Sequence, residues 1–377
     1  MPLEVRAISE EQFRGLGESW HDLLSHSAED PLFMSWPWMF SWWETWAKVY
    51  DLQLLLLGAY DEDGELIGLA PLYLHDLNAL GKFRIRRIHF IGNAWRIGPS
   101  VRTEYVGLIS RKGKELLVSR MIASYLAAQQ WDELVVCDTV MGGHEIFGQA
   151  LCNEAGTSAF VRAETAGVCL DTERGFADWL SGLGQNTRLK LYNRRSIFEV
   201  HSGGSIEECQ FTSEGYFDFF RGLNAFHQVR WGKPCFDQKA VQFHLRLLAR
   251  LSPNQKPKLS ILKAGSEPVS YLYDIQAGTK VYNLQAGYSE VFHKKLSLGT
   301  LHLGYAIEDA FSDAGIMHYD FLAGCGKNSF YKSRFKGKLV TFKTVEFVRS
   351  PWLKLAYRYQ SWLPRRLKSR INRSLGL

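Results

Sequence analysis

Between Tyr282 and Lys338 the chain gathers several chemically active side chains around one predicted helix. A strand is expected over 282–288, and an amphipathic helix over 301–314. The loop between them contains a glycine, two hydroxyl groups and two lysines. A helix N-terminus offers free backbone N–H groups and the positive end of the helix dipole, which suits a pyrophosphate. The residues predicted to form such a site are Lys294, Lys295, Ser297, Leu298, Gly299 and Thr300. An ordinary helix cap with two solvated lysines is the alternative interpretation.

A second group of reactive side chains follows the next predicted strand, His318 to Leu322. Ligands usually meet α/β sheets at loops that follow strand ends. In the segment after this strand, Tyr331 could donate a proton and Lys332 could stabilise an oxyanion or a phosphate. A packed tyrosine and a surface lysine are the corresponding structural alternatives.

The elements that would position these residues occur twice along the chain. A hairpin, further strands, a helix and a strand are expected in the first half and again in the second, which favours an internal duplication. The predicted elements of the first half are the hairpin 52–60 and 66–74, the helix 114–129 and the strand 131–138. Those of the second half are the hairpin 258–264 and 268–276, the strand 280–289, the helix 301–314 and the strand 318–322. Two helices, 176–183 and the basic 187–199, lie between the halves. We therefore expect an N-terminal domain over 1–172, a C-terminal domain over 173–348 and a tail over 349–377.

Composition narrows the functional classes. The chain has 377 residues, of which 46% are hydrophobic and 22% charged, as expected of a globular protein with two domains. Its formal net charge is +6, but residues 351–377 contain seven Lys or Arg and no acidic residue, so the body is nearly neutral. A nucleic-acid enzyme usually has a basic body. The six cysteines are scattered, and no signal peptide or apolar run of membrane-spanning length is apparent, which favours a cytoplasmic protein. His and acidic residues show no metal-ligand spacing, and we expect no metal.

Several segments together resemble the CelD/BcsL family of cellulose-biosynthesis acetyltransferases and, more distantly, the Fem-type peptidoglycan aminoacyltransferases. In the second half the matching segments are Asn186–Lys190 with Arg194–Arg195, Phe226–Gly232, Phe243–His244, Ser297–Gly299, Asp320–Gly324 and Tyr331–Lys332. In the first half they are Phe33-x-x-x-Pro37-Trp38 and Gly68–Leu72. The similarity covers about 33–338. The family often has further glycines after the Arg230-Trp231 pair, whereas this chain continues Gly232-Lys233-Pro234-Cys235, which leaves the acceptor open.

The resemblance implies an α/β fold of mixed sheets, organised as two tandem GNAT-like (acyl-CoA N-acyltransferase) domains. It also implies that the loop before Gly299 receives the pyrophosphate of acetyl-CoA or another acyl-CoA, used as a co-substrate with no permanently bound cofactor. The strand from Tyr282, including Gln285, would pair with the pantetheine arm. An amine would then attack the thioester directly. Asp320 is the candidate base, Tyr331 the acid and Lys332 the electrostatic group. A strand-end carboxylate that caps a loop is the alternative for Asp320.

The acceptor is expected beside the donor. His227 and Arg230 lie three residues apart, on one face of a predicted helix over 217–230, and Trp231 follows them. These three residues could line an acceptor groove, although His227 could equally be a satisfied core histidine. Arg188, Arg194 and Arg195 could meet an anionic acceptor or the 3′-phosphate of the donor, and a solvated helix face is as consistent with the sequence.

The sequence therefore favours an acyl-CoA-dependent N-acyltransferase that acts on an amine in envelope polysaccharide or lipid metabolism. An aminoacyl-tRNA-dependent transferase of the Fem type is weighted lower, because the body lacks a basic track for tRNA. A non-catalytic GNAT-fold accessory protein of exopolysaccharide synthesis is the third hypothesis. No DNA partner is expected. The aromatic and basic residues after 350 suggest peripheral contact with the inner face of the membrane, and a terminal helix packed on the protein is the alternative.

Overall fold

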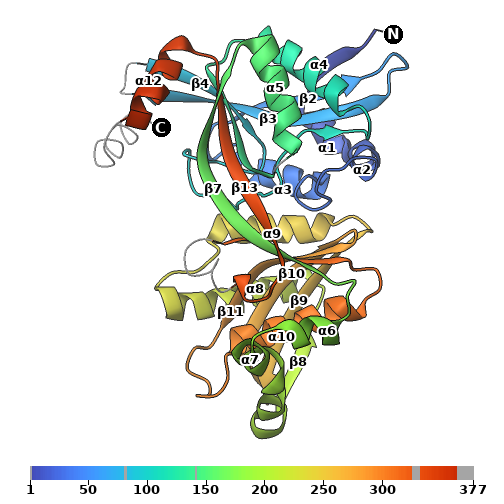
Figure 1. Cartoon of the computed structure of the whole chain (residues 1–377), viewed down its shortest axis with the longest axis vertical. Coiled ribbons are helices and arrows are strands. Elements are labelled where there is room, and N and C mark those ends of the chain that lie inside the picture. Colours follow the sequence, from blue (N-terminus) through green and yellow to red (C-terminus); the bar gives the residue numbers. More distant parts are fainter. Residues whose placement is uncertain (1, 80–82, 141, 325–331, 363–377) are drawn as a thin grey trace. The chain divides into compact units, whose positions relative to one another are not determined.

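The computed structural model of the chain describes residues 2–79, 83–140, 142–324 and 332–362 (Figure 1). The chain divides into two compact units. Unit 1 comprises residues 1–165 and 341–377, and unit 2 comprises residues 166–340. Two long strands, β7 (Ser158–Asp171) and β13 (Lys338–Val348), each run from one unit into the other. The three expected domains, 1–172, 173–348 and 349–377, stay a prediction.

The sheet of unit 1 is mixed. Its strand order is β1, β2, β3, β4, β6, β13 and β7, and the short β5 pairs with β3. The bounds not yet given are β1 Glu4–Ile8, β2 Gln53–Tyr60, β3 Leu66–Ala79, β4 Phe83–Phe90, β5 Ile109–Ser110 and β6 Glu133–Val140. β4 and β6 run parallel, whereas β1, β2, β3 and β4 are joined by antiparallel pairing. The turn of the β2–β3 hairpin is fixed by Asp61, whose Oδ1 accepts the N–H groups of Asp63 and Glu65.

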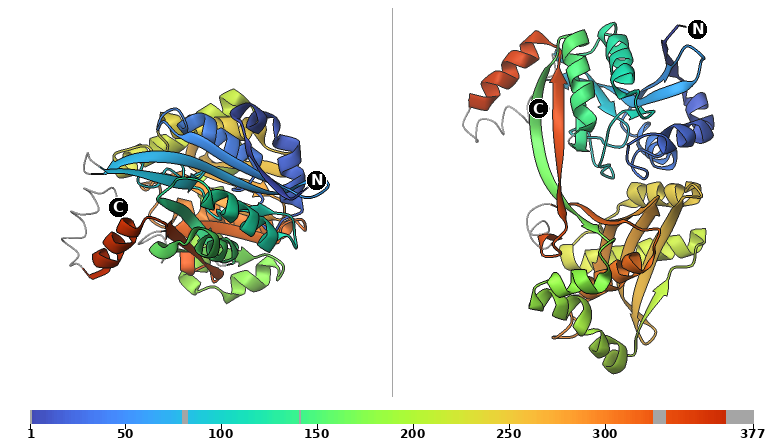
Figure 2. Two further views of the ribbon diagram at one scale, coloured as in Figure 1. Left: turned by 90° about the horizontal axis from the view of Figure 1, so that it is seen from above. Right: turned by 45° about the vertical axis from the view of Figure 1, so that its right-hand side comes forward.

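Helices cover this sheet. They are α1 Glu10–Gly15, α2 Gly17–Ser25, α3 Trp36–Trp46, α4 Glu115–Ala127, α5 Gly143–Ala155 and α12 Pro351–Trp362. Figure 2 shows α4 and α5 beside each other on one side of the sheet, where apolar residues of both helices and of β3, β4 and β6 form one core. In α3, Trp38, Trp42 and Trp46 are almost completely buried. The tryptophan-rich segment is thus core, which explains the high aromatic content of the first half.

The sheet of unit 2 has the strand order β7, β12, β11, β10, β9 and β8. The bounds are β8 Gly204–Glu208, β9 Gln255–Ala264, β10 Glu267–Ala277, β11 Lys280–Tyr288 and β12 His318–Gly324. β8 to β11 are antiparallel neighbours, β11 and β12 run parallel, and β12 is antiparallel to β7. The chain passes through a helix between β11 and β12, as the connection of two parallel neighbouring strands requires.

Two layers of helices enclose the unit 2 sheet. They are α6 Phe176–Gly182, α7 Gln185–Arg188, α8 Ser213–Trp231, α9 Gln238–Arg250 and α10 Leu298–Ser312, with two π-helical turns, Leu189–Asn193 and Ile197–His201. Tyr271 and Tyr273 of β10 pack against α8 and α9, while Leu272 packs with α10. α10 approaches the first π-helical turn closely, because a Cβ at Gly304 would lie 2.1 Å from the Leu191 carbonyl oxygen. The basic segment predicted as one helix over 187–199 is therefore a succession of short helical turns folded onto α10.

The expected repetition of elements is visible in the order and direction of the strands. β2, β3, β4, α4 and β6 in unit 1 correspond to β9, β10, β11, α10 and β12 in unit 2. Each series begins with an antiparallel hairpin and ends with two parallel strands joined through a helix. Both series contain the hairpins and helices expected from the sequence, with ends that differ by a few residues.

Candidate functional site

The parallel strands β11 and β12 separate soon after they meet. Their pairing covers Lys280 to Tyr282 on β11 and His318 to Asp320 on β12. On its other side β11 stays paired with β10 as far as Tyr288, with a bulge at Leu284, since Tyr273 pairs with Gln285 and Asp274 with Asn283. Within the described residues, the β12-facing edge of β11 beyond Tyr282 is thus without a strand partner.

Side chains bind the backbone of this open edge. The Ala286 N–H donates to Oε1 of Gln285 at 3.0 Å, and Nε2 of His227 donates to the Ala286 carbonyl oxygen at 2.8 Å. Burial lowers the pKa of His227. The imidazole is therefore neutral at pH 7, and because Nε2 carries the proton, the lone pair lies on Nδ1. The predicted groove residue His227 is part of this site and is anchored to β11.

The N-terminus of α10 carries no negative charge of its own. No acidic residue occurs in its first turn, and the cap residue Ser297 makes no side-chain bond to the helix backbone. Its hydroxyl is instead hydrogen-bonded to that of Thr300, at 3.0 Å. Gly299 is needed for packing, because a Cβ there would lie 2.3 Å from the ring of Tyr288. The Tyr288 hydroxyl accepts a hydrogen bond of 2.6 Å from Arg230, which holds the ring in place.

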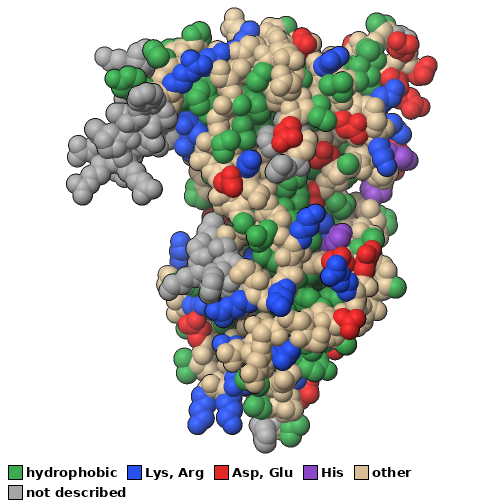
Figure 3. Space-filling view, viewed as in Figure 1, with side chains coloured by type: hydrophobic (Ala, Val, Ile, Leu, Met, Phe, Trp, Pro, Cys, Tyr) green, Lys and Arg blue, Asp and Glu red, His purple; other side chains and the backbone are tan. Residues whose placement is uncertain are grey.

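These features surround one cavity of about 490 Å³ in unit 2. The residues that line it are Asn186, Thr187, Lys190, His227, Arg230, Trp231, Asn283, Leu284, Gln285, Ala286, Tyr288, Ser297, Gly299, Thr300, Leu303, Lys332, Arg334 and Phe335. Four of them are Lys or Arg, and none of these described residues is acidic. Glu290, outside the lining, pairs with Arg230 at 2.7 Å. In Figure 3, Lys and Arg side chains also gather on the visible face of unit 2. The cavity therefore suits an anionic ligand.

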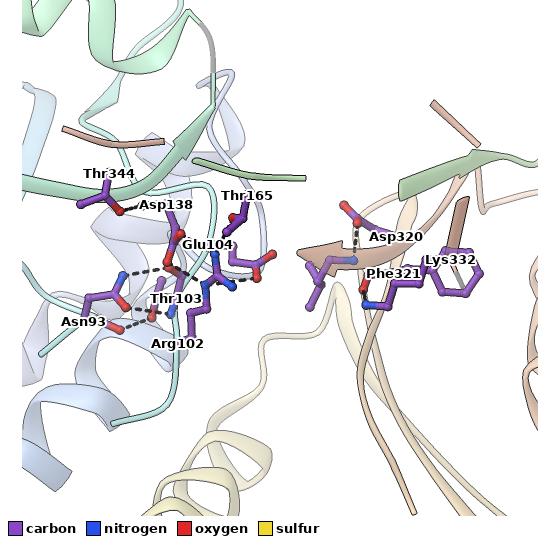
Figure 4. Close-up of polar contacts among 12 residues, drawn as sticks. Asn93, Arg102, Thr103, Glu104, Asp138, Thr165, Asp320, Phe321, Lys332 and Thr344 are labelled. Atoms are coloured by element: carbon purple, nitrogen blue, oxygen red, sulfur yellow. Dashed lines mark hydrogen bonds and ion pairs between the residues drawn. The ribbon is translucent and has the colours of Figure 1, made fainter. Parts of the chain in front are cut away.

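Asp320 lies outside the cavity wall. It is completely buried, and its Oδ1 accepts the Leu322 N–H at 2.8 Å (Figure 4). Lys280 approaches Oδ2 at 3.8 Å. Leu322 has a φ of +59°, a backbone conformation that costs energy for a branched side chain and that this short-range bond supports. The geometry thus matches the alternative interpretation of Asp320 as a strand-end carboxylate that caps a loop.

The other catalytic candidates have different outcomes. Lys332 lines the cavity and donates a hydrogen bond to the Phe321 carbonyl oxygen (Figure 4). Tyr331 lies outside the described residues. Whether these groups act in catalysis stays a prediction.

The remaining predicted residues divide between the cavity wall and its surroundings. Ser297, Gly299, Thr300, Gln285, Arg230 and Trp231 all line the cavity. Those that do not are Lys294, Lys295, Leu298, Tyr282 and Arg188. Both lysines are exposed, Leu298 and Tyr282 are buried, and Arg188 donates to the Ser181 carbonyl oxygen at 2.6 Å. The loop lysines therefore do not form part of the cavity wall.

Comparisons with known proteins identify a domain within unit 2 and the fold of the chain. Residues 185–333 match the model of the acetyltransferase (GNAT) domain family, which places a GNAT-type acetyltransferase domain in unit 2. Among curated proteins, no sequence matches the chain significantly. A GNAT domain is a transferase domain, which uses an acyl donor and an acceptor.

Solved structures resemble the chain over nearly its whole length. The crystal structure of FemX is 14% identical, with a TM-score of 0.59, and the match covers 93% of this chain and 99% of FemX. The structure of L-PGS from Bacillus licheniformis is 12% identical, with a TM-score of 0.50 and coverage of 99% and 98%. The C-terminal domain (DUF2156) of a putative lysylphosphatidylglycerol synthetase from Agrobacterium fabrum is 9% identical, with a TM-score of 0.50 and coverage of 93% and 96%. At such low identity these matches concern the fold, and they confirm the expected mixed α/β fold of the tandem-GNAT type.

Sequence reasoning missed part of the cavity wall. The additional residues are Asn186, Thr187, Lys190, Tyr288, Leu303, Arg334 and Phe335. Asn283, Leu284 and Ala286 also line the cavity and belong to the strand 282–286, which was expected to pair with the pantetheine arm. Most of these wall residues belong to β11 and to the turns before α8, and they meet only because β12 diverges from β11. The bulge at Leu284 also shifts the alternation of β11 side chains between the two faces of the sheet. The sequence pattern alone therefore could not tell which of these side chains face the cavity.

Proposed function

We propose that unit 2 binds an acyl-CoA and transfers its acyl group to an amine. The observation that supports this most is the open edge of β11, where side chains of Gln285 and His227 bind the backbone of Ala286 in place of a neighbouring strand. An extended ligand with amide groups can occupy such an edge by strand-like pairing. The pantetheine arm of CoA has this shape and these groups.

The donor's phosphates would lie at the N-terminus of α10. Ser297, Gly299 and Thr300 line the cavity there, and the first turn has no carboxylate to repel an anion. Lys190 and Arg334 line the same cavity and would add favourable charge. A pyrophosphate at one end and an acyl thioester at the other fit a cavity with a cationic wall and a strand edge.

In the proposed reaction the amine nitrogen attacks the thioester carbonyl carbon, the C–S bond breaks, and CoA leaves as a thiolate that takes up a proton. We assign the role of base to His227, because it is neutral, lines the cavity and holds its lone pair on Nδ1. Asp320 is less suitable, since its carboxylate is buried and used by Leu322. The Ala286 N–H, released by Gln285, would stabilise the oxyanion together with Lys332. Tyr331 remains the proposed acid.

The acceptor would enter beside Arg230 and Trp231. Trp231 ends α8 and is 61% exposed while it lines the cavity, and the Arg230 guanidinium lies 4.8 Å from its ring centroid. An exposed indole next to a cation suits an acceptor that has both a polar and an apolar or sugar face. An amine from envelope polysaccharide or lipid metabolism stays the predicted class of acceptor.

Calorimetry of the full chain with CoA and acetyl-CoA, followed by an assay for released thiol with amine acceptors, tests the proposal. We expect CoA itself to bind, because its phosphates and pantetheine make the proposed contacts, and to raise the melting temperature by mass action. Absence of binding at millimolar CoA would contradict it. If aminoacyl-tRNA bound and acyl-CoA did not, aminoacyl transfer would replace this proposal.

A further inference from the structure

The last described helix, α12, has two unlike faces. Leu353 and Tyr357 are buried against Ile85 of β4 and Val348 of β13. The Tyr357 hydroxyl also donates to the buried carboxylate of Glu133. These contacts fix the helix on unit 1, as the interpretation of a packed terminal helix expects.

The other face of α12 exposes large side chains. Trp352, Leu355 and Tyr359 are 42%, 67% and 71% exposed, and their spacing of three and four residues puts them on one side of the helix. Leu355 and Tyr359 therefore expose most of their apolar surface, while Leu353 and Tyr357 anchor the helix. In both views of Figure 2, α12 lies at the margin of unit 1, where such a face can reach a partner.

A cationic pocket lies at the same end of the unit 1 sheet. β4 begins there at Phe83, β6 at Glu133, and β13 ends at Val348, two residues before α12. The pocket has a volume of about 410 Å³ and is lined by Arg84, Arg86, Gln129, Gln130, Trp131, Asp132 and Arg349. Figure 3 shows Lys or Arg side chains beside hydrophobic ones at the end of unit 1 where Figure 1 places α12.

The carboxylates at this pocket leave an excess of positive charge. Arg84 and Arg86 both pair with Asp76, and Asp132 in the lining accepts the backbone N–H of Arg86, so three arginines face two carboxylates. Arg349 donates to the carbonyl oxygens of Gln129 and Ala127 at the end of α4, which are neutral groups.

We propose that this end of unit 1 binds the surface of an anionic phospholipid bilayer. Trp352, Leu355 and Tyr359 would enter the boundary between headgroups and acyl chains, where Trp and Tyr are favoured. Arg84, Arg86 and Arg349 would meet lipid phosphates. The exposed Leu355 favours a bilayer over a nucleic acid, because burial in lipid removes its apolar surface from water whereas a phosphate backbone does not. This inference is independent of the acyl transfer proposed for unit 2.

Co-sedimentation of the full chain with vesicles tests this surface. The vesicles are phosphatidylcholine alone or phosphatidylcholine with phosphatidylglycerol, each at low and high salt. We expect binding to the phosphatidylglycerol vesicles at low salt, weakened by high salt because the charges are exposed. The triple variant Trp352→Ala/Leu355→Ala/Tyr359→Ala should bind at least about 10-fold more weakly. Equal melting temperatures of the variant and the wild type would verify that the substitutions leave the fold intact.

A matched control removes exposed apolar side chains elsewhere on unit 1. The variant Val49→Ala/Leu116→Ala/Ile146→Ala changes residues that are 47%, 54% and 40% exposed and should bind vesicles like the wild type. The proposal is overturned if the wild type stays in the supernatant with phosphatidylglycerol, if both triple variants bind equally, or if phosphatidylcholine alone binds as well. Binding to bulk tRNA but not to vesicles would likewise overturn it and assign the surface to RNA.

Discussion

The two units use the same order of elements but treat their parallel strands differently. In unit 1, β4 is paired with β6 as far as His89 and ends at Phe90, one residue later. In unit 2, β11 continues six residues beyond its last pairing with β12, to Tyr288. The extra length in unit 2 leaves an edge at which a ligand can bind. In unit 1 the corresponding strand ends before an open edge can form.

The N-termini of the helices that follow these strands, α4 and α10, also differ in charge. In unit 1, Glu115 lies in the first turn of α4, and its Oε1 accepts the Gly113 N–H at 2.9 Å. The positive end of this helix thus has a carboxylate of its own. The first turn of α10 in unit 2 has none, and its residues line the cavity. The positive end of α10 in unit 2 is therefore available to an anionic ligand, whereas a carboxylate already compensates the positive end of α4 in unit 1.

Unit 1 also contains buried or partly buried ion pairs. Arg87 and Glu133, on the parallel strands β4 and β6, form an ion pair that is almost completely buried. In a second group, Arg102 donates to the carboxylate of Asp138 and to the Thr165 hydroxyl (Figure 4). These pairs stabilise a structural body, whereas the cations at the unit 2 cavity have no acidic residue beside them in the described lining. The same succession of elements can thus provide a framework in one unit and a binding site in the other.

Substitution of Gly299 should give the largest effect, because it removes what makes the α10 terminus different. Gly299→Glu would place a carboxylate at this terminus and push the Tyr288 ring from its position. We expect CoA affinity to fall by at least about 1000-fold, as both charge and shape oppose the phosphates. Calorimetry measures the affinity. Gly299→Ala, which displaces the ring without adding charge, should lower CoA affinity roughly 10-fold. Unchanged CoA affinity in the Glu variant would contradict the assignment of this helix terminus as the phosphate site.

Replacement of His227 tests the proposed base. His227→Gln keeps a donor for the Ala286 carbonyl oxygen but has no basic nitrogen, so turnover should fall by about 100-fold or more. In the wild type, activity should decline on the acid side below pH 6.5, since the pKa of His227 is lowered from that value and protonation removes the base. This acid limb should disappear in the variant. Asp320→Asn is the control and should change stability more than turnover; the reverse result would return the role of base to Asp320.

Lys332 should contribute at the cavity and not through general surface charge. Lys332→Ala should lower turnover by about 100-fold, because a positive charge near the developing oxyanion is lost, while CoA binding changes much less. Lys294→Ala provides a matched control, since Lys294 is exposed and lies outside the cavity lining. Steady-state kinetics of both variants measure the difference. Near-normal turnover in Lys332→Ala would show that this lysine only supports the Phe321 carbonyl.

Asp274 connects the bulge of β11 to the interior of unit 2. Its carboxylate accepts hydrogen bonds from Asn283 and Tyr319, both at 2.7 Å, and burial raises its pKa from 3.8 to about 7. A raised carboxyl pKa means that the folded state holds the proton between about pH 4 and pH 7 where the unfolded chain has lost it. Stability should therefore fall as the pH rises through this range.

The variant Asp274→Asn should lose this dependence of the unfolding free energy on pH, which is on the order of 1 kcal/mol per pH unit. The comparison with the wild type is needed because His244 and His302, with pKa values lowered to about 3, oppose the trend. Urea unfolding of both proteins at several pH values measures the difference. Parallel stability curves for the two proteins would show that Asp274 does not titrate in this range.

The sequence predicted the elements better than the site, and the reasons are physical. Hairpins such as β9–β10 were accessible because a short turn with Gly265 separates two apolar runs, and Gly265 adopts a φ of +60°. β7 and β13 were not predicted, because strands that pass between units have a changing environment and no regular alternation. Other helices and strands, including β1, β4, α5 and α9, were missed as well.

Site residues were predicted where local sequence decides their position. Ser297, Gly299 and Thr300 line the cavity because a helix begins at them, which a loop before an amphipathic segment reveals. Asp320 was harder to interpret, because whether a strand-end carboxylate faces a ligand or its own loop depends on where β12 diverges from β11. That divergence is a tertiary feature that no spacing in the chain records.

The smallest expected effect concerns Glu115, the carboxylate at the α4 terminus of unit 1. Glu115→Gln removes its charge and should reduce stability by roughly 0.5 kcal/mol, because a partly exposed helix-dipole interaction is weak. It should leave CoA affinity of the full chain unchanged, since unit 1 has no open strand edge at the corresponding place. Denaturant unfolding and calorimetry measure the two quantities. A second CoA site in this variant would mean that the Glu115 carboxylate alone prevents unit 1 from binding CoA. An unchanged single site would support the view that the divergence of β11 and β12 decides which unit binds CoA.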